Sequence, residues 1–161
     1  MAQLAEITIS LERQTLVLRA GSELERTFAV STSAQGAGEL NGSFRTPRGL
    51  HQIRACIGAG RPLGAVFVGR RPTGEIYSEA LARQYPDRDW ILTRILWLSG
   101  LEPGLNRFGE VDTMRRYIYI HGTPDTEPVG VPGSIGCIRM RNQDILEVFD
   151  LVAAGTRVLI K

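Results

Sequence analysis

The sequence predicts a fold in which β-strands outnumber helices, and three observations lead to this expectation. Apolar and polar residues alternate over residues 7–11 and again over 16–18, with the polar Glu12-Arg13-Gln14 between them, which is typical of a hairpin. Residues 116–121 combine β-branched and aromatic side chains, a composition that favours a strand. The clearest helical period, over residues 143–153, comes only near the end of the chain.

Further strands are expected where short apolar runs lie between turn-forming residues. Residues 31–43 are rich in Gly, Ser and Ala, and residues 99–110 in Gly, Pro and Asn, so both are expected to be loops. Residues 36–43 and 99–110 are candidates for lids. The apolar segment Asp89–Leu98 is compatible with a strand or a short helix. The remaining strand candidates are Phe28–Val30, Leu50–Ile57, Gly64–Val68 and Thr156–Ile160.

The strand over residues 116–121 orients a histidine. A period of two puts Tyr117, Tyr119 and His121 on one face, and Ile118 and Ile120 on the other. If the isoleucines face the core, His121 points into a cleft lined by tyrosines.

The helix over Gln143 to about Ala153 is predicted together with its ends. Asn142 is a good N-cap, and Asp144 lies in the first turn, where the helix dipole favours a carboxylate. Gly155 is expected at the C′ position. The buried stripe is expected to comprise Ile145, Leu146, Val148, Phe149 and Val152.

Length and composition indicate one globular domain over residues 1–161. A chain of this length can bury a hydrophobic core, and 43% hydrophobic and 22% charged residues are ordinary values. A net charge of +2 is too small to argue for nucleic-acid binding. Of the 19 basic residues all but Lys161 are arginine. Genome composition explains this, or some arginines grip carboxylates with both nitrogens, which lysine cannot do.

The compartment is inferred from what the sequence lacks. No segment approaches the roughly 18 apolar residues of a membrane helix, so no membrane insertion is expected. Met1–Glu6 has neither the basic nor the apolar region of a signal peptide. We therefore expect a cytoplasmic protein, or a periplasmic one if the N-terminus was trimmed. Two cysteines make no disulfide framework, so both are expected to be reduced.

One short segment carries the residues of cysteine catalysis. Cys137 lies in a Gly/Ser-rich turn, 16 positions after His121 and two before Arg139. A thiol needs a base and nearby positive groups to act as a nucleophile, and His121 is the nearby base. The carbonyl of Gly122 would orient its second ring nitrogen. The N–H groups of Gly136 and Cys137 are candidates for an oxyanion hole. A thiolate–imidazolium pair of Cys137 and His121 would titrate as a unit, and acylation would fall at low pH.

Structural interpretations compete with these chemical ones. Cysteine is often a small buried hydrophobe, which is the favoured interpretation for Cys56 but not for Cys137 in its glycine-rich turn. Neither His-x₃-His nor Cys-x₂-Cys occurs, so no metal and no cofactor are expected. The pairs Arg70-Arg71 and Arg115-Arg116 are expected to be solvated charges.

Taken together, these motifs resemble the L,D-transpeptidase catalytic domain, the YkuD or ErfK family. His121-Gly122-Thr123, followed by Ser134-x-Gly136-Cys137-Ile138-Arg139-Met140, is similar to the family's catalytic motif. Thr46-Pro47-x-Gly49 and the closing residues 142–158 are also similar, so the resemblance covers most of the chain. One departure is Ile135, which stands where the family commonly has a second histidine. His121 is then the one candidate base of the motif.

The resemblance implies a mainly β fold, a sandwich of bent mixed β-sheets whose groove holds the cysteine, with the C-terminal helix packed after the cysteine motif. It implies a cysteine acyl-enzyme that cleaves tetrapeptide stems of peptidoglycan between the diamino acid and the terminal D-Ala. Cys137, His121 and Gly122 would be catalytic, and carbapenems would acylate the cysteine. Substrate or oxyanion contacts would come from Gly136, Arg139, Ser134, Tyr119 and Arg94.

The fate of the thioester separates the alternatives. Hydrolysis gives an L,D-carboxypeptidase that trims muropeptides in cell-wall recycling, which the expected cytoplasmic location favours. Attack by an amine gives a transpeptidase that forms cross-links or exchanges D-amino acids. Because Ile135 replaces a histidine, a catalytically impaired peptidoglycan-binding module is the second alternative.

Overall fold

The computed structural model describes residues 4–161; residues 1–3, the start of the N-terminal segment considered above, lie outside the described residues. The helices are α1 (Glu79–Gln84), the 3₁₀ helix η1 (Gly109–Val111) and α2 (Asn142–Leu151). The strands are β1 (Ala5–Ser10), β2 (Thr15–Ala20), β3 (Leu24–Ser31), β4 (Gly49–Ile57), β5 (Ala65–Val68), β6 (Arg71–Ile76), β7 (Ile91–Gly100), β8 (Tyr119–Thr123), β9 (Ile138–Arg141) and β10 (Arg157–Ile160).

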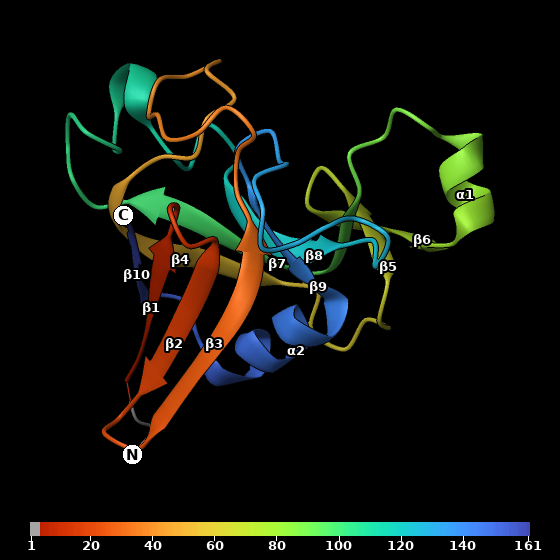
Figure 1. The fold of residues 1–161 in the computed structure, drawn as a ribbon, viewed down its shortest axis with the longest axis horizontal. Coiled ribbons are helices and arrows are strands. Elements are labelled where there is room, and N and C mark those ends of the chain that lie inside the picture. Colours follow the sequence, from red (N-terminus) through yellow and green to blue (C-terminus); the bar gives the residue numbers. More distant parts are fainter. Residues whose placement is uncertain (1–3) are drawn as a thin grey trace.

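The strands form a mixed sheet that bends back on itself. Their order is β4-β10-β1-β2-β3-β9-β8-β7-β5-β6, and β4 also pairs with β7. The first eight strands of this order therefore make a closed circuit, from which β5 and β6 extend as a hairpin (Figure 1). The pairs β1–β10 and β8–β9 are parallel. The predicted mainly β fold of bent mixed sheets is confirmed.

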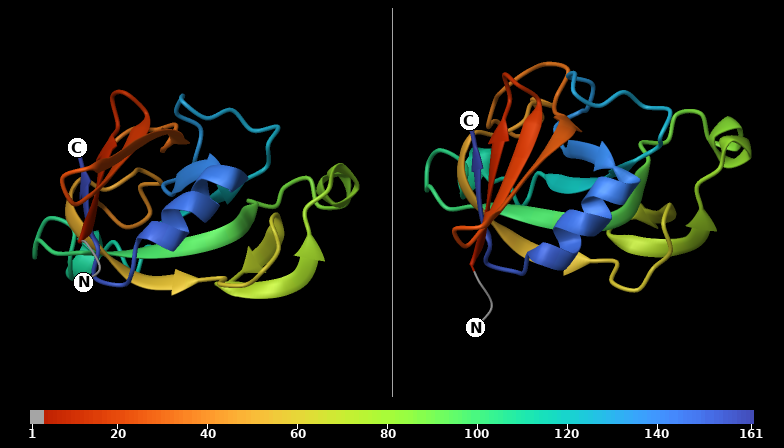
Figure 2. Two further views of the ribbon diagram at one scale, coloured as in Figure 1. Left: turned by 90° about the horizontal axis from the view of Figure 1, so that it is seen from below. Right: turned by 60° about the horizontal axis from the view of Figure 1, so that its bottom comes forward.

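The core lies between the layers that this bend creates. Figure 2 shows β1 to β3 on one side and β4 with β7 on the other, with α2 beside them. The alternating residues of the first hairpin are buried, as the periodicity predicts, and they meet apolar residues of the opposite layer. This core includes Ile7, Ile9, Leu16, Leu18, Ile53, Leu96, Leu98, Ile120, Ile138 and Met140.

The helix α2 packs against β7, β8 and β9, with Ile145 and Val148 buried in the core. Two details of its predicted ends are wrong. The N-cap is Arg141, and Asn142 is the first helical residue, because its side chain bonds neighbouring segments and does not cap the helix. The helix ends at Leu151, so Gly155, at φ 95°, belongs to the turn before β10.

The ambiguous segment after Asp89 is a strand, β7, because it pairs with β4, β5 and β8. The predicted strand over residues 116–121 begins only at Tyr119, since Tyr117 adopts a positive φ of 56° that breaks the ladder. Helix α1, capped by the Ser78 side chain, and strand β6 were not predicted. None of the helices within residues 4–161 has the length and hydrophobicity to cross a bilayer.

Candidate active site

Two parallel strands place the motif residues on one face. In the β8–β9 pair His121 lies opposite Arg139, and Cys137 immediately precedes β9. Residues two apart in a strand share a face, so Cys137 and Arg139 project on the same side as His121 and Tyr119. Residues separated by the long loop after Thr123 are thus brought together by strand register.

The turn before Cys137 is held by its own hydrogen bonds. The buried Ser134 hydroxyl donates to Cys137 O at 2.6 Å and accepts from the Gly136 N–H at 3.1 Å. Thr46 donates its hydroxyl to Gly136 O at 2.9 Å. Gly136 has φ 133°, which favours glycine. The predicted substrate contacts of Ser134 and of the Gly136 N–H are therefore not supported, because both groups are already bonded within the turn; the Cys137 N–H remains the candidate oxyanion donor.

His121 is a fully buried base whose tautomer is determined by its surroundings. Its Nδ1 lies 2.7 Å from Gly122 O, and since a carbonyl can only accept, Nδ1 carries the hydrogen. Nε2 therefore keeps its lone pair, and it is buried with no hydrogen-bond partner within residues 4–161. Burial lowers the pKa of His121 below its ordinary value, although the bond to Gly122 opposes this.

Gly122 itself is required by close packing. A Cβ at this position would collide with Asn142 Oδ1 and would lie 2.6 Å from Leu92 O. The backbone next to His121 therefore approaches β7 and α2 closely, and a side chain at position 122 would disturb the segment whose carbonyl accepts from His121 Nδ1.

Cys137 is a neutral thiol in the resting site. Sγ accepts from the Tyr119 N–H at 3.3 Å and donates to Tyr117 O at 3.4 Å. Burial raises the pKa of Cys137 to about 12, with Asp89 acting in the same direction and the Tyr119 N–H against it. Together with the lowered pKa of His121, this makes the hypothesised thiolate–imidazolium pair unfavourable before substrate binds.

Arg139 is paired with a residue that the sequence analysis missed. Its guanidinium donates to Asp89 Oδ1 at 3.0 Å and to Gly133 O at 3.1 Å. It therefore holds the cysteine turn, and a substrate carboxylate would have to compete with Asp89. No motif marks Asp89, which is 50 positions from Arg139 and sits between Arg88 and Trp90.

A groove of about 560 Å³ contains Cys137. Its walls come from the loop around Phe44, the turn at Arg70, residues 116–119 and the cysteine turn. Tyr117 and Tyr119 line it, as predicted, but His121, which was expected to point into it, is fully buried and is not among its lining residues. Ile135 also lines the groove and is 55% exposed at the position of the missing histidine. Asn41 and Gly42 also line the groove, so the loop over residues 31–43 forms part of its wall.

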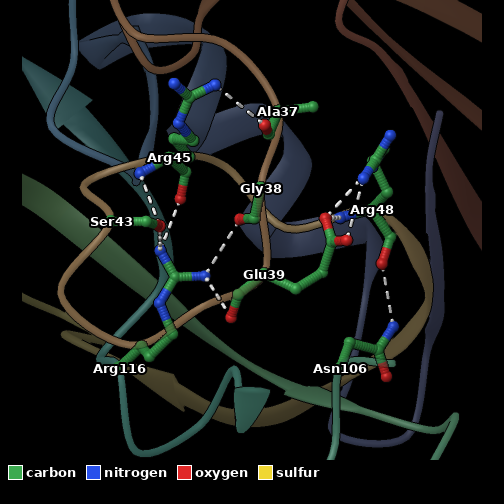
Figure 3. A network of polar contacts seen from close by, with 8 residues as sticks. All are labelled: Ala37, Gly38, Glu39, Ser43, Arg45, Arg48, Asn106 and Arg116. Atoms are coloured by element: carbon green, nitrogen blue, oxygen red, sulfur yellow. Dashed lines mark hydrogen bonds and ion pairs between the residues drawn. The ribbon is translucent and has the colours of Figure 1, made fainter. Parts of the chain in front are cut away.

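Arg116, expected to be a solvated charge, holds this wall (Figure 3). One of its terminal nitrogens donates to Gly38 O and Glu39 O at 3.2 Å each. The other donates to Ser43 Oγ at 3.4 Å and to Arg45 O at 2.5 Å. The expectation is wrong because the loop's carbonyls converge on this one side chain, which is half-buried as a result.

Arg70 was also expected to be a solvated charge, and it lies in the groove. Its Nη1 donates to Tyr119 Oη at 2.9 Å. Its guanidinium lies 4.7 Å from the Trp97 ring centroid and 4.8 Å from that of Tyr117. Sequence offers no signal for this, because a Gly-Arg turn between two strands gives no indication of what the hairpin packs against.

Arg94 is not a groove residue, and its predicted contact with a substrate carboxylate is not supported. The side chain is buried, and Nη1 donates to Arg61 O at 2.9 Å and Thr93 O at 2.6 Å. The guanidinium lies 5.3 Å from the ring of Phe149 in α2. On β7 it therefore faces the helix.

The sequence profile of the L,D-transpeptidase catalytic domain (YkuD) matches residues 5–160. The putative L,D-transpeptidase YkuD of Bacillus licheniformis is 46% identical over 46 residues, which are 29% of this chain and 28% of the relative. The probable L,D-transpeptidase ErfK/SrfK of Salmonella typhimurium is 51% identical over 45 residues, or 28% of this chain and 15% of the relative.

Solved structures agree on the fold. L,D-transpeptidase 3 of Mycobacterium tuberculosis, in complex with a faropenem-derived adduct, superposes with a TM-score of 0.61 at 14% identity, covering 99% of this chain and 60% of that one. The L,D-transpeptidase LdtMt1 in complex with imipenem gives 0.57 at 16% identity, covering 99% and 59%. This chain thus spans about three-fifths of those structures. Because the family profile covers nearly all of it, the chain belongs to the L,D-transpeptidase catalytic domain (YkuD) family.

Proposed function

We propose that this chain is a cysteine acyl-enzyme that attacks tetrapeptide stems of peptidoglycan between the diamino acid and the terminal D-Ala. The observation that carries the proposal is the buried His121, which shares a face with Cys137. Its Nδ1 bonds to Gly122 O, and its Nε2 has no hydrogen-bond partner within residues 4–161. A neutral base with a fixed tautomer can accept the thiol proton when substrate arrives.

In the first step, the Cys137 proton moves to His121 Nε2 while Sγ forms a bond to the carbonyl carbon. The carbonyl electrons move to the oxygen, for which the Cys137 N–H is our candidate donor. The positive charges of Arg139 and Arg116 lower the pKa of Cys137 and so favour the charge that develops on sulfur. Collapse of the intermediate breaks the C–N bond, and the proton on Nε2 passes to the leaving D-Ala amine.

The resulting thioester is then resolved by a second nucleophile. When no amine is supplied, water remains, and His121 Nε2 takes a proton from it as the new C–O bond forms. The C–S bond then breaks and the proton on Nε2 passes to the departing Sγ, which restores the thiol and the neutral imidazole. We therefore propose hydrolysis to the tripeptide, an L,D-carboxypeptidase reaction, as the outcome without acceptor. The same thioester would pass to an amine in a transpeptidase reaction.

Product analysis tests both steps. Wild type incubated with a disaccharide-tetrapeptide should release D-Ala, and Cys137→Ala and His121→Gln should not. Added D-Met or glycine separates the fates, since exchange of the terminal residue shows transfer and tripeptide alone shows hydrolysis. Undiminished release from Cys137→Ala would refute the mechanism.

The exposed Ile135 favours a second candidate, a binding module with impaired catalysis, because it places an apolar side chain where the family commonly has histidine. The two candidates differ in covalent chemistry. A carbapenem mass adduct that is lost in Cys137→Ala supports the acyl-enzyme, and binding of stem peptide without any adduct or D-Ala release supports the module.

A further inference from the structure

The side chain of Arg70 is a preorganised cation in the groove that contains Cys137. One N–H donates to Tyr119 Oη at 2.9 Å, and the guanidinium rests against the rings of Trp97 and Tyr117. A guanidinium has five donors, and this arrangement occupies one of them with a recorded hydrogen bond. Stacking therefore restricts the side chain while most of its donors stay available.

Acidic side chains do not neutralise this cation. Among residues 4–161 Arg70 forms no ion pair with Asp, Glu or the C-terminus. The acidic residue that lines the groove, Asp89, is paired with Arg139 at 3.0 Å. The groove thus presents the positive charge of Arg70 without a matching negative charge.

The backbone that carries Arg70 adopts a conformation that would suit glycine better. Gly69 and Arg70 join β5 to β6, and both have positive φ, 56° and 65°. Such two-residue hairpin turns prefer Asn or Gly, and a long side chain in the left-handed region costs free energy. Two further non-glycine residues with positive φ, Phe44 and Tyr117, also line the groove. Strained backbone of this kind gathers at binding sites.

Tyr119 contacts both Arg70 and the thiol of Cys137. The Tyr119 N–H donates to Cys137 Sγ at 3.3 Å, and the hydroxyl of the same residue accepts from Arg70. A peptide held with its carbonyl at Sγ would therefore extend along Tyr119 towards Arg70. The planar fork of a guanidinium matches a carboxylate with two parallel hydrogen bonds.

We propose that Arg70 binds a free carboxylate of the peptide whose carbonyl Cys137 attacks, and so orients the substrate and selects it. This rests on the function proposed above. We take as candidates the two free carboxylates nearest the attacked carbonyl, the C-terminus of the leaving D-amino acid and the side chain of the diamino acid.

The test uses the full chain and three synthetic tetrapeptides. One has a free C-terminus and diaminopimelate, one has a C-terminal amide, and one has lysine in place of diaminopimelate. The variants are Arg70→Gln and Arg70→Gly, with Arg71→Gln as the matched control, because Arg71 is exposed and does not line the groove. Arg70→Gly should fold, since glycine suits the φ of 65°, and thermal unfolding checks this.

With the first peptide, both Arg70 variants should lose about 10- to 100-fold in kcat/KM, mostly through KM, as expected for one charge-assisted pair. Arg71→Gln should match wild type. The peptide that lacks the recognised carboxylate should be a poor substrate for wild type, and the Arg70 variants should cleave it with the same kcat/KM as wild type. The peptide that behaves in this way identifies which carboxylate Arg70 binds.

Three results would overturn the proposal. Equal activity of Arg70→Gln and Arg71→Gln would remove Arg70 from recognition while leaving the acyl-enzyme intact. Equal losses on all three peptides would show that Arg70 recognises neither of the two candidate carboxylates. A wild type that releases no D-Ala and forms no carbapenem adduct would refute the proposed function together with this inference.

Discussion

The conformation of residues 38–45, which form one wall of the groove, depends on hydrogen bonds from Arg116. The variant Arg116→Met is expected to show this. The methionine keeps most of the apolar stem but removes the hydrogen bonds to Gly38 O, Glu39 O, Ser43 Oγ and Arg45 O. A charged donor contributes a net 1.5–3 kcal/mol per bond, but the four bonds share two nitrogens and are not additive. Burial also lowers the pKa of Arg116, a sign that desolvation offsets part of the gain.

We therefore expect Arg116→Met to lower the free energy of unfolding by about 3 kcal/mol, which corresponds to roughly 6–12 °C in Tm for a chain of this size. Phe44 lines the groove from the same loop, so acylation of Cys137 by a carbapenem should slow at least several-fold. Thermal unfolding and the rate of adduct formation by mass spectrometry measure the two effects.

The matched control is Arg115→Met, which removes the same charge from the neighbouring, exposed position. It should change Tm by no more than about 2 °C, as is usual for a surface substitution. If Arg116→Met unfolds within about 2 °C of this control and is acylated at the same rate, Arg116 does not hold the wall and the reasoning from its hydrogen bonds is wrong.

Three further predictions follow from other parts of the site and its support. The pKa of Cys137 is raised and that of His121 is lowered, so the rate of carbapenem acylation should be constant from about pH 6.5 to 9. At lower pH the rate should fall as His121 becomes protonated. A rate that rises with a midpoint between about pH 7 and 9 would instead show that the thiol titrates in this range. Burial lowers the pKa of His51 from 6.5 to about 4. As the pH drops from 6.5 towards 4, His51 therefore becomes protonated in the unfolded chain before it does in the folded one. The free energy of unfolding should fall by about 3 kcal/mol over this interval. Urea unfolding of wild type and His51→Gln at pH 7 and 4.5 should show a smaller loss in the variant. Thr46→Val leaves Gly136 O without its donor and should cost about 1–3 kcal/mol and slow acylation, whereas Thr46→Ser should restore both.

Local patterns predicted the parts of the fold that depend on local physics. The alternation over residues 7–11 and 16–18 is the first hairpin, because one face of each strand must be buried. The pairing of Cys137 with His121 could be proposed from residue types, their spacing in the sequence and the Gly/Ser-rich turn. No local pattern indicates that β8 and β9 pair in parallel. This pairing places the side chains of Cys137 and His121 on one face.

The wrong predictions share a physical cause, because polar groups of the backbone and of side chains form hydrogen bonds with whatever partners the fold brings near. Asn142 has the residue type of a helix cap, yet its amide donates to Thr123 O at 3.0 Å and accepts from Thr93 Oγ1 at 2.6 Å. Ser134 and the Gly136 N–H look like oxyanion groups until their mutual hydrogen bond is seen. Such hydrogen-bond partners lie far away in the sequence or are brought together by a particular turn conformation. Local composition does not predict either kind of partner.

The preference for arginine over lysine in this chain has a structural explanation at three positions around the groove and core. The sequence suggested that some arginines grip carboxylates, but Arg94 and Arg116 mainly bind backbone carbonyls, and Arg139 binds one carbonyl and one carboxylate. A guanidinium reaches two acceptors at once because its donors diverge from a rigid plane, and an ammonium on a flexible stem does so less effectively. At each position at least one acceptor is a backbone carbonyl of a segment outside the strands, and such a carbonyl must find a donor when it is partly buried. Arg70 differs, because its recorded contacts are aromatic rings and a hydroxyl, and this difference is what leaves its donors available to a ligand.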